Sequence, residues 1–136
     1  RGGRSVLVVV LVVDRLKTIN DTLGHQAGDQ ALMQLADVLR ATFRKSDILA
    51  RMGGDEFAIM AIEASEANET ELLDRLRENL REVNHGTNDT CSLSISAGTA
   101  RYSGEEGTGL DDLLARADRM MYQEKKGKEE VLEGRR

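Results

Sequence analysis

The spacing of apolar residues predicts strands and helices in alternation along the chain. Residues 5–14 are β-branched and continuously apolar, which is typical of a central strand covered on both faces. Over residues 25–44, apolar side chains recur at helical spacing, so we expect an amphipathic helix there. Its expected inward face consists of Leu32, Leu35, Ala36, Leu39 and Phe43.

Two short apolar segments, residues 47–52 and 56–62, flank the pair Gly53 and Gly54. Glycine readily takes the positive φ that tight turns require, so this arrangement predicts a β-hairpin. The sequence then predicts a helix over residues 69–83, a strand with one buried face over residues 90–102, and a last helix over residues 109–125. The residues expected to face the core in these three elements are Leu72, Leu73, Leu76, Leu80 and Val83, then Cys91, Leu93, Ile95 and Ala97, then Leu110, Leu113, Leu114, Ala117 and Met121.

The predicted element order indicates an α/β fold of the α+β sandwich type. A hairpin combined with crossover helices favours helices packed on a largely antiparallel central sheet. At 136 residues the chain has the length of one ordinary domain. We expect this domain to occupy residues 1–128, with the charged residues from Lys125 onward solvated or frayed and residues 129–136 forming a charged tail.

Composition narrows the possible partners and the compartment. With 24 acidic and 19 basic residues the net charge is -5, which argues against broad binding to nucleic acid or to anionic membrane. The longest apolar run is far shorter than the roughly 20 residues that cross a bilayer, and the single cysteine cannot form an internal disulfide. We expect a cytoplasmic domain, or the cytosolic part of a larger membrane-anchored protein, truncated at its N-terminus.

The segment RMGGDEF, residues 51–57, places Asp55 and Glu56 at the predicted turn. Two adjacent carboxylates suit a hard cation such as Mg²⁺, which takes one or two carboxylates together with substrate phosphates. Glycines beside them would let a bulky ligand approach the backbone. A plain hairpin tip with solvated acids is an equally valid interpretation of these residues alone.

The segment VVDRLKTINDTLGHQAGD, residues 12–29, joins the buried strand to the following helix. Free amides of Arg15, Leu16 and Lys17 at the start of a helix can cradle phosphate, and the Lys17 ammonium would add positive charge. Asn20 and Asp29 offer an amide and a carboxylate that can pair with the donors of a guanine edge. They can equally be simple helix caps, and the spacing leaves both interpretations open.

Arg44 and Asp47 stand three residues apart just before the predicted hairpin. An exposed ion pair worth about 0 to 1 kcal/mol is the favoured interpretation of such a pair, ahead of a phosphate or guanine ligand. His25 and His85 have no partner at metal-ligand spacing, and we expect His25 to pack or to cap a helix. No Ser-His-Asp or Cys-His arrangement can be assembled, which removes most hydrolase mechanisms.

Taken together, these segments closely resemble the GGDEF family of diguanylate cyclases. The matching stretches are LKTINDTLGHQAGD at residues 16–29, RMGGDEF at 51–57, SLSISAGTA at 92–100 and LLARADRMMYQEKKGK at 113–128. The resemblance implies a fold related to nucleotidyl cyclases and polymerase palms. It also implies condensation of two GTP into the bacterial second messenger cyclic di-GMP, in a face-to-face homodimer with Mg²⁺ or Mn²⁺, under an upstream sensory domain.

The resemblance also implies a role for each matching residue. Asn20 and Asp29 correspond to the guanine-reading pair, and Arg44 and Asp47 to the RxxD motif of product inhibition, which reverses the preference for a plain ion pair. The phosphate-binding group comprises Lys17, Lys125 and the backbone at Arg15 and Leu16, with Gly53 and Gly54 leaving room for the nucleotide. The catalytic acids are Asp55 and Glu56, which also bind the metal together with the backbone carbonyl of Val13.

The chain departs from the family at two positions that bear on turnover. Val12 stands where the family has an aspartate that binds the metal, and a valine cannot coordinate Mg²⁺. The final family motif is one residue shorter here, and Lys128 stands near the position of an arginine. The alternative to a working cyclase is therefore a catalytically impaired domain that serves as a receptor for cyclic di-GMP or GTP.

Overall fold

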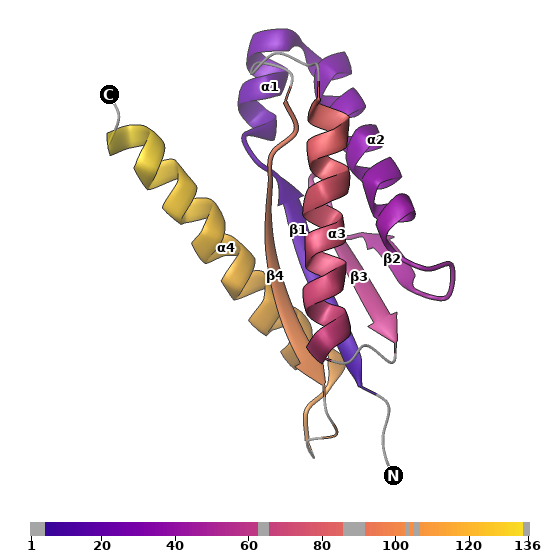
Figure 1. The fold of residues 1–136 in the computed structure, drawn as a ribbon. Helices are drawn as coiled ribbons and strands as arrows, with labels where there is room; N and C mark the ends of the chain where they lie inside the picture. The colour runs from indigo at the N-terminus through magenta and orange to yellow at the C-terminus, as the bar shows by residue number, and fades with distance from the viewer. Residues whose placement is uncertain (1–4, 63–65, 86–91, 103, 105–106, 135–136) are drawn as a thin grey trace.

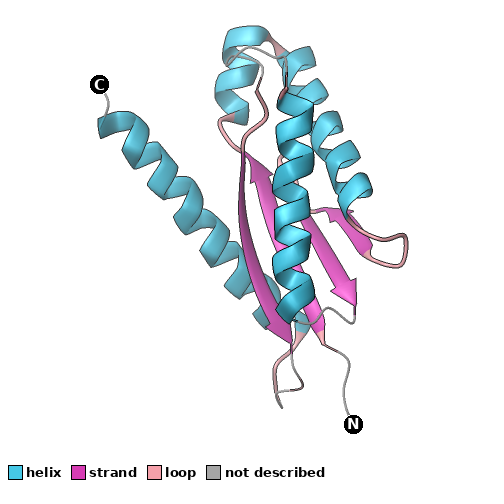
Figure 2. Cartoon of the chain, viewed as in Figure 1, coloured by secondary structure: helices cyan, strands magenta, loops and turns pink. Residues whose placement is uncertain are grey.

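The computed structural model describes residues 5–62, 66–85, 92–102, 104 and 107–134. Its four strands form one antiparallel sheet in the order β2-β3-β1-β4, as Figures 1 and 2 show. The α+β class and the largely antiparallel sheet predicted from the sequence are confirmed. The elements are β1 (Val6–Val13), α1 (Leu16–Leu23), α2 (His25–Thr42), β2 (Ile48–Arg51), β3 (Glu56–Ile62), α3 (Glu66–Asn84), β4 (Ile95–Tyr102) and α4 (Leu110–Gly134).

Strand β1 lies inside the sheet between β3 and β4 and is covered on both faces, as its apolar run predicts. Alternate side chains point to opposite faces of a strand, so β1 contributes to two separate cores. Leu7, Val9, Leu11 and Val13 pack with residues of α2 and α3. Val8, Val10 and Val12 pack with residues of α4. The sheet is therefore the middle of three layers.

The chain between β1 and β2 forms two helices where the sequence analysis expected one. Gly24 ends α1 and precedes α2, with a φ of 95° that L side chains rarely adopt. Its amide donates a hydrogen bond to the carbonyl of Asn20, which closes the last turn of α1. The short helix α1 consequently sits at the end of the sheet where β1 ends (Figure 1).

Strand β4 is shorter than predicted and is covered on both faces. Residues 92–94 are described but not in a strand, and the predicted start at residues 90 and 91, which includes Cys91, lies outside the described residues. Ile95 and Ala97 pack partly against the α3 side, whereas Ser96, Gly98 and Ala100 are buried on the α4 side. The expectation of one buried face is wrong because small side chains let α4 approach β4 closely.

The apolar faces predicted for the helices hold with one exception. Leu35, Leu39 and Leu76 are buried as expected, but Leu110 is exposed at the start of α4. Residues 126–131 of the charged segment are exposed as expected, yet the segment continues α4 through Gly134 and is not frayed. No helix in the described part of the chain is long and apolar enough to cross a membrane.

Polar side chains of α3 bind the C-terminal end of α2. Arg75 Nη1 donates to the carbonyl oxygen of Thr42 at 3.0 Å, and Asn79 Nδ2 donates to the Thr42 hydroxyl at 2.9 Å. The last carbonyls of a helix lack partners within the helix and attract positive charge. These contacts fix the point from which the chain turns toward Arg44 and the hairpin.

Gly98 is the position where the contact between α4 and β4 is closest. A Cβ atom built at Gly98 would lie 1.9 Å from the carbonyl oxygen of Ala117 and 2.5 Å from the amide nitrogen of Met121. Both are backbone atoms of α4, so a side chain here can be accommodated only if the helix moves. Glycine at this position therefore sets the distance between the helix and the sheet.

Replacing Gly98 with alanine is expected to lower the free energy of unfolding by about 1 to 3 kcal/mol, because the added methyl overpacks the interface with α4. Gly127→Ala is the matched control, since Gly127 lies within α4 and a Cβ atom there would meet no other atom within 4 Å. That variant should raise the free energy of unfolding by about 0.5 to 1 kcal/mol. Urea unfolding of both variants gives the comparison, and equal effects would contradict the close contact.

Candidate functional site

The segment RMGGDEF forms the predicted hairpin, with β2 ending at Arg51 and β3 starting at Glu56. The Met52 amide donates to the Glu56 carbonyl at 2.8 Å. The Arg51 guanidinium donates to the carbonyls of Gly53 and Gly54, at 3.2 and 2.5 Å. Arg51, which the sequence analysis did not single out, thus holds the turn.

The glycines of this turn serve a different purpose from the predicted one. Neither Gly53 nor Gly54 is among the residues with positive φ in the described chain, so the expectation that the turn needs this conformation is wrong. A Cβ at either position would meet no atom within 4 Å. The two glycines therefore leave open space beside Asp55.

An open cavity of about 410 Å³ brings the hairpin together with the segment that follows β1. Predicted site residues from both segments line it, although they lie far apart in the sequence. These are Leu16, Lys17, Asn20, Asp29, Gly54 and Asp55. Arg51 and His25 also line the cavity, and the exposed position of His25 at the start of α2 does not fit the expectation of a packed or capping histidine.

Asn20 and Asp29 do not act as helix caps. Asn20 lies inside α1 and Asp29 inside α2, while Arg15 and Gly24 occupy the N-cap positions without a side-chain cap hydrogen bond. A Cβ at Gly28 would lie 1.8 Å from Asn20 Oδ1, so the Asn20 side chain rests directly on the backbone of α2. Of the two interpretations left open by the sequence, the capping one is excluded.

The start of α1 carries a strained residue. Arg15 has a φ of 57° and a ψ of 34°, the left-handed conformation, and is the one non-glycine residue with positive φ in the described chain. This conformation is costly for an L residue and is often kept at functional sites. Helix geometry leaves the first amides of α1, including those of Leu16 and Lys17, without intrahelical acceptors. They are available to a ligand.

Glu56 faces Val12 across the paired strands β1 and β3. Paired residues of antiparallel strands point to the same face, so both side chains lie on the face covered by α4. Burial raises the pKa of Glu56, and a hydrogen bond to Asp118 and the charges of Asp118 and Asp55 raise it further. Val12 itself is only 3% exposed, among the apolar residues that contact α4.

The acidic side chains near the hairpin suit a metal ion that is bound by protein and phosphate together. They suit a metal ion bound by protein groups alone less well. Within the described ranges, no three acidic, histidine or cysteine side chains are arranged to hold a metal ion. Asp55 and Glu56 could supply the one or two carboxylates that Mg²⁺ takes when phosphates complete its coordination. Val13, buried at the end of β1, could add its backbone carbonyl. Val12 adds no ligand.

Asp14 is the most heavily bonded acid near the site. It is 9% exposed and accepts hydrogen bonds from Ser94 Oγ at 2.7 Å and Ser96 Oγ at 2.6 Å. Lys128 Nζ of α4 lies 2.9 Å from Asp14 Oδ2. Burial by itself raises the pKa of Asp14, but the hydrogen bonds from Ser96, Lys128 and Ser94 outweigh burial and hold this pKa below its ordinary value.

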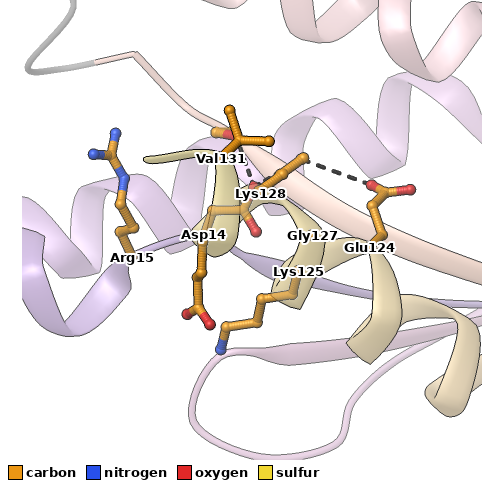
Figure 3. A pocket seen from close by; sticks show the side chains of 9 residues that line it. Asp14, Arg15, Glu124, Lys125, Gly127, Lys128 and Val131 are labelled. Atoms are coloured by element: carbon orange, nitrogen blue, oxygen red, sulfur yellow. Dashed lines mark hydrogen bonds and ion pairs between the residues drawn. The ribbon is translucent and has the colours of Figure 1, made fainter. Parts of the chain in front are cut away.

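A second cavity, of about 520 Å³, lies between this network and α4. Asp14, Arg15, Lys125 and Lys128 line it, as Figure 3 shows. The structure thus divides the predicted nucleotide-binding residues between two cavities, with the side chains of Arg15 and Lys125 on the second. Sequence analysis did not identify Asp14 as a link to Lys128, since the two are separated by most of the chain.

Arg44 and Asp47 line neither of these cavities. Asp47 Oδ2 accepts a hydrogen bond from the Arg44 amide at 2.9 Å, and Arg44 Nη2 lies 3.7 Å from Asp47 Oδ1. The Asp47 side chain is 1% exposed, whereas that of Arg44 is 61% exposed and donates to the Ile62 carbonyl at 2.8 Å. Asp47 Oδ1 is buried and accepts no hydrogen bond from the described residues.

Asp14→Asn is expected to lower the free energy of unfolding at pH 7 by about 1 to 3 kcal/mol, because charged hydrogen bonds are lost. A carboxylate whose pKa is lower in the folded state stabilises the fold fully above its unfolded-state pKa of about 3.9. This stabilisation disappears as the pH falls through the folded-state pKa. Urea titrations between pH 7 and pH 2 should therefore show the wild type and the variant converging in acid.

Asp37→Asn serves as the control for this titration, because Asp37 forms an exposed ion pair with Arg40 on α2. Its effect should stay within about 0 to 1 kcal/mol at every pH. A constant difference between wild type and Asp14→Asn down to pH 2 would contradict the lowered pKa of Asp14.

Comparison with known proteins identifies the family. The family described as "Diguanylate cyclase, GGDEF domain" matches residues 1–130. The chain is 33% identical over 128 residues to the probable diguanylate cyclase DgcJ of Escherichia coli K12, covering 94% of this chain and 25% of that protein. It is 35% identical over 134 residues to the diguanylate cyclase DgcP of Pseudomonas aeruginosa, covering 98% of this chain and 20% of that protein. The chain thus spans a quarter or less of these two relatives.

Solved structures agree with the sequence comparison. The GGDEF domain of DgcB from Caulobacter crescentus, solved in complex with c-di-GMP, is similar with a TM-score of 0.79 and 28% identity, over 92% of this chain and 74% of that one. The GGDEF domain of PA1120 from Pseudomonas aeruginosa gives a TM-score of 0.78 and 36% identity, over 91% of this chain and 78% of that one. The fold, the linked motifs and these similarities show that the chain belongs to the GGDEF family of diguanylate cyclase domains.

Proposed function

We propose that this chain binds GTP with its guanine in the 410 Å³ cavity and its phosphates extending toward Lys125 on the 520 Å³ cavity, and that two copies condense two GTP molecules into cyclic di-GMP. One observation carries the proposal: the cavity unites Lys17, Asn20 and Asp29 with Gly54 and Asp55 of the hairpin. A base-reading pair, a cation and an acid beside open backbone form the set of groups that a nucleoside triphosphate requires.

Guanine recognition is assigned to Asn20 and Asp29. The Asp29 carboxylate can accept hydrogen bonds from the N1-H and N2-H₂ donors of guanine, and the Asn20 amide offers both a donor and an acceptor. Gly28 supports this arrangement, because any larger residue there would displace the Asn20 side chain. Adenine lacks both of these donors, so the pair favours GTP over ATP.

The triphosphate is assigned to the start of α1 and to two lysines. Backbone amides at Arg15 and Leu16 offer donors at a helix N-terminus, and Lys17 and Lys125 add positive charge. Mg²⁺ or Mn²⁺, held by Asp55, Glu56 and the Val13 carbonyl, would supply further neutralisation of the phosphate charge. The protein contributes mainly positioning and electrostatic stabilisation.

Two copies must meet face to face for the reaction, because each copy accepts one nucleotide. The 3′-hydroxyl of each GTP attacks the α-phosphate of the other, and each attack forms one O–P bond and releases pyrophosphate and a proton. The relatives are several times longer than this chain, which supports a role as the output domain of a larger signalling protein. We propose that an upstream sensory domain controls the encounter of two copies, in the cytoplasm.

Val12 supports a second candidate function. A buried valine opposite Glu56 leaves the cation with one carboxylate fewer than the family pattern provides. Each 1.36 kcal/mol lost from transition-state stabilisation costs tenfold in rate. The second candidate is therefore a domain that binds GTP or cyclic di-GMP and turns over little or not at all.

Val12→Asp tests both the cation site and the reaction. The new carboxylate would be buried beside Glu56 and near Asp118, so without cation the free energy of unfolding should fall by about 2 kcal/mol or more. Mg²⁺ should restore stability, by about 2.7 kcal/mol at 100 times its Kd. With GTP and Mg²⁺ or Mn²⁺, wild type should form cyclic di-GMP slowly and the variant at least tenfold faster.

Val10→Asp is the matched control, because Val10 is buried on the same face of β1 but pairs with Ala58. It should lose stability without recovery in Mg²⁺. Absence of product from both wild type and Val12→Asp, with GTP binding intact, would favour the receptor. Absence of GTP binding by the wild type would refute the cyclase, and absence of binding to both GTP and cyclic di-GMP would refute the receptor as well.

We also propose that Arg44 and Asp47 bind cyclic di-GMP as an inhibitory site. The exposed guanidinium of Arg44 suits a phosphate of the ligand. The buried Asp47 carboxylate accepts a hydrogen bond from the Arg44 amide and so fixes the turn that presents Arg44.

Arg44→Ala is expected to weaken cyclic di-GMP binding at least tenfold in calorimetry, because one charged contact is lost. Arg40→Ala, which removes a similarly exposed arginine paired with an aspartate at the same spacing, should leave the affinity unchanged. Equal affinities in wild type and Arg44→Ala would reject this site.

A further inference from the structure

Among the side chains whose burial the structure describes, none in the second half of α4 joins the apolar core. Leu113, Ala117 and Met121 are buried at four-residue intervals, but no described residue of α4 after Met121 is buried. Gly127 interrupts this half, and a glycine inside a helix costs about 1 kcal/mol relative to alanine. Residues 122–131 of α4 are therefore held in place by something other than buried apolar side chains of their own.

Lys128 provides that attachment. Its Nζ atom contacts Asp14 Oδ2 at 2.9 Å, Glu124 Oε1 at 3.7 Å and the Ile95 carbonyl oxygen. Two of its three donor hydrogens form hydrogen bonds, to Asp14 and to Ile95, and the Glu124 carboxylate adds an ion pair. Asp14 is itself held by Ser94 and Ser96, so Lys128 binds to a fixed point on the sheet.

The same contact completes a row of side chains along β4. The Thr99 amide donates to Met120 Sδ at 3.5 Å, the Ala97 amide to Glu124 Oε1 at 3.2 Å, and Lys128 binds the Ile95 carbonyl. Four helical residues rise about 6 Å, and two strand residues rise about 6.6 Å. The two repeats therefore match, and α4 side chains satisfy the backbone of β4 at the edge of the sheet.

Lys125, three residues before Lys128, lines the 520 Å³ cavity with Arg15. Figure 3 shows Lys128 directed toward Glu124, whereas Lys125 leaves the helix in a different direction. The position of Lys125 depends on where this turn of α4 lies. The contacts of Lys128, together with that of Glu124 to the Ala97 amide, determine that position, because no side chain of α4 with described burial after Met121 is buried.

We propose that Lys128 is a positioning residue, which together with Asp14 holds α4 so that Lys125 faces the phosphates of GTP. Lys128 is not itself a phosphate ligand, since its charge is already matched by Asp14 and Glu124. This inference rests on the proposed function for the role of Lys125. The attachment of α4 itself rests only on the contacts of Lys128.

Asp14→Asn distinguishes a positioning role of Lys128 from direct phosphate binding, because the two roles predict opposite changes in the affinity for a GTP analogue. If Lys128 positions the helix, then Lys128→Met and Asp14→Asn should each weaken binding of a non-hydrolysable GTP analogue about three- to tenfold, and the double variant should be no weaker. If Lys128 binds phosphate directly, Asp14→Asn should strengthen binding, because it frees the ammonium and removes a negative charge. That result would overturn the inference.

Two further measurements complete the experiment: the affinity of each variant for guanosine, and the rate of amide hydrogen exchange in α4. Guanosine affinity should be unchanged in every variant, and amide exchange over residues 122–131 should accelerate in Lys128→Met and Asp14→Asn alone. Lys125→Met should weaken analogue binding without faster exchange, and Lys126→Met should change neither measurement. If wild type fails to bind the GTP analogue, the proposed function fails, while the exchange data still decide the attachment of α4. Unchanged exchange in both Lys128→Met and Asp14→Asn would overturn that attachment.

Discussion

The burial of β1 on both faces is the constraint on which the rest of the structure depends. Its alternating side chains belong to two cores, one shared with α2 and α3 and one with α4. A strand held in this way cannot shift register, because a slip of one residue would exchange the two faces. Its C-terminal end is consequently a rigid point, and Val12, Val13, Asp14 and Arg15 follow one another there in fixed directions.

The two faces of the sheet carry different parts of the site. On the α4 face, Val12 and Glu56 lie side by side with Asp118 nearby, which concentrates negative charge against an apolar neighbour. Beyond the end of β1, Asp14 turns its carboxylate to the serines that precede and begin β4 and to Lys128. One acidic group is thus poorly compensated and the other fully compensated. This difference explains why the pKa values of Glu56 and Asp14 shift in opposite directions.

Close approach of backbones is the second theme of this domain. Gly98 lets α4 lie directly on β4, and Gly28 lets the Asn20 side chain lie on α2. At both positions glycine is required because it lacks a Cβ atom, and not because its φ is unusual. Gly24 is the contrasting case, where the backbone conformation itself separates α1 from α2.

The sequence by itself determined the element types, the central position of β1, the hairpin at RMGGDEF and the family. These features are local, since they depend on apolar periodicity and on linked motifs. Short elements and element ends were less well predicted: α1 was not predicted as a helix of its own, since the one helix expected between β1 and β2 covered residues 25–44. The end of α4 was placed too early because charged residues carry no periodic signal. The second buried face of β4 was not predicted because its residues are small and weakly apolar or polar, so they give no hydrophobic signal in the sequence.

Tertiary structure alone decided which distant residues meet. Asn20 and Asp29 share a cavity with Gly54 and Asp55 because β1 and β3 are neighbours in the sheet. Lys128 reaches Asp14 because α4 runs past the edge strand β4 back toward the end of the sheet where β1 ends (Figure 1). Such contacts depend on the order of strands and on the path of a helix, which no local pattern of side chains encodes. The sequence names the groups at this site, and packing of the sheet decides which partner each of them has.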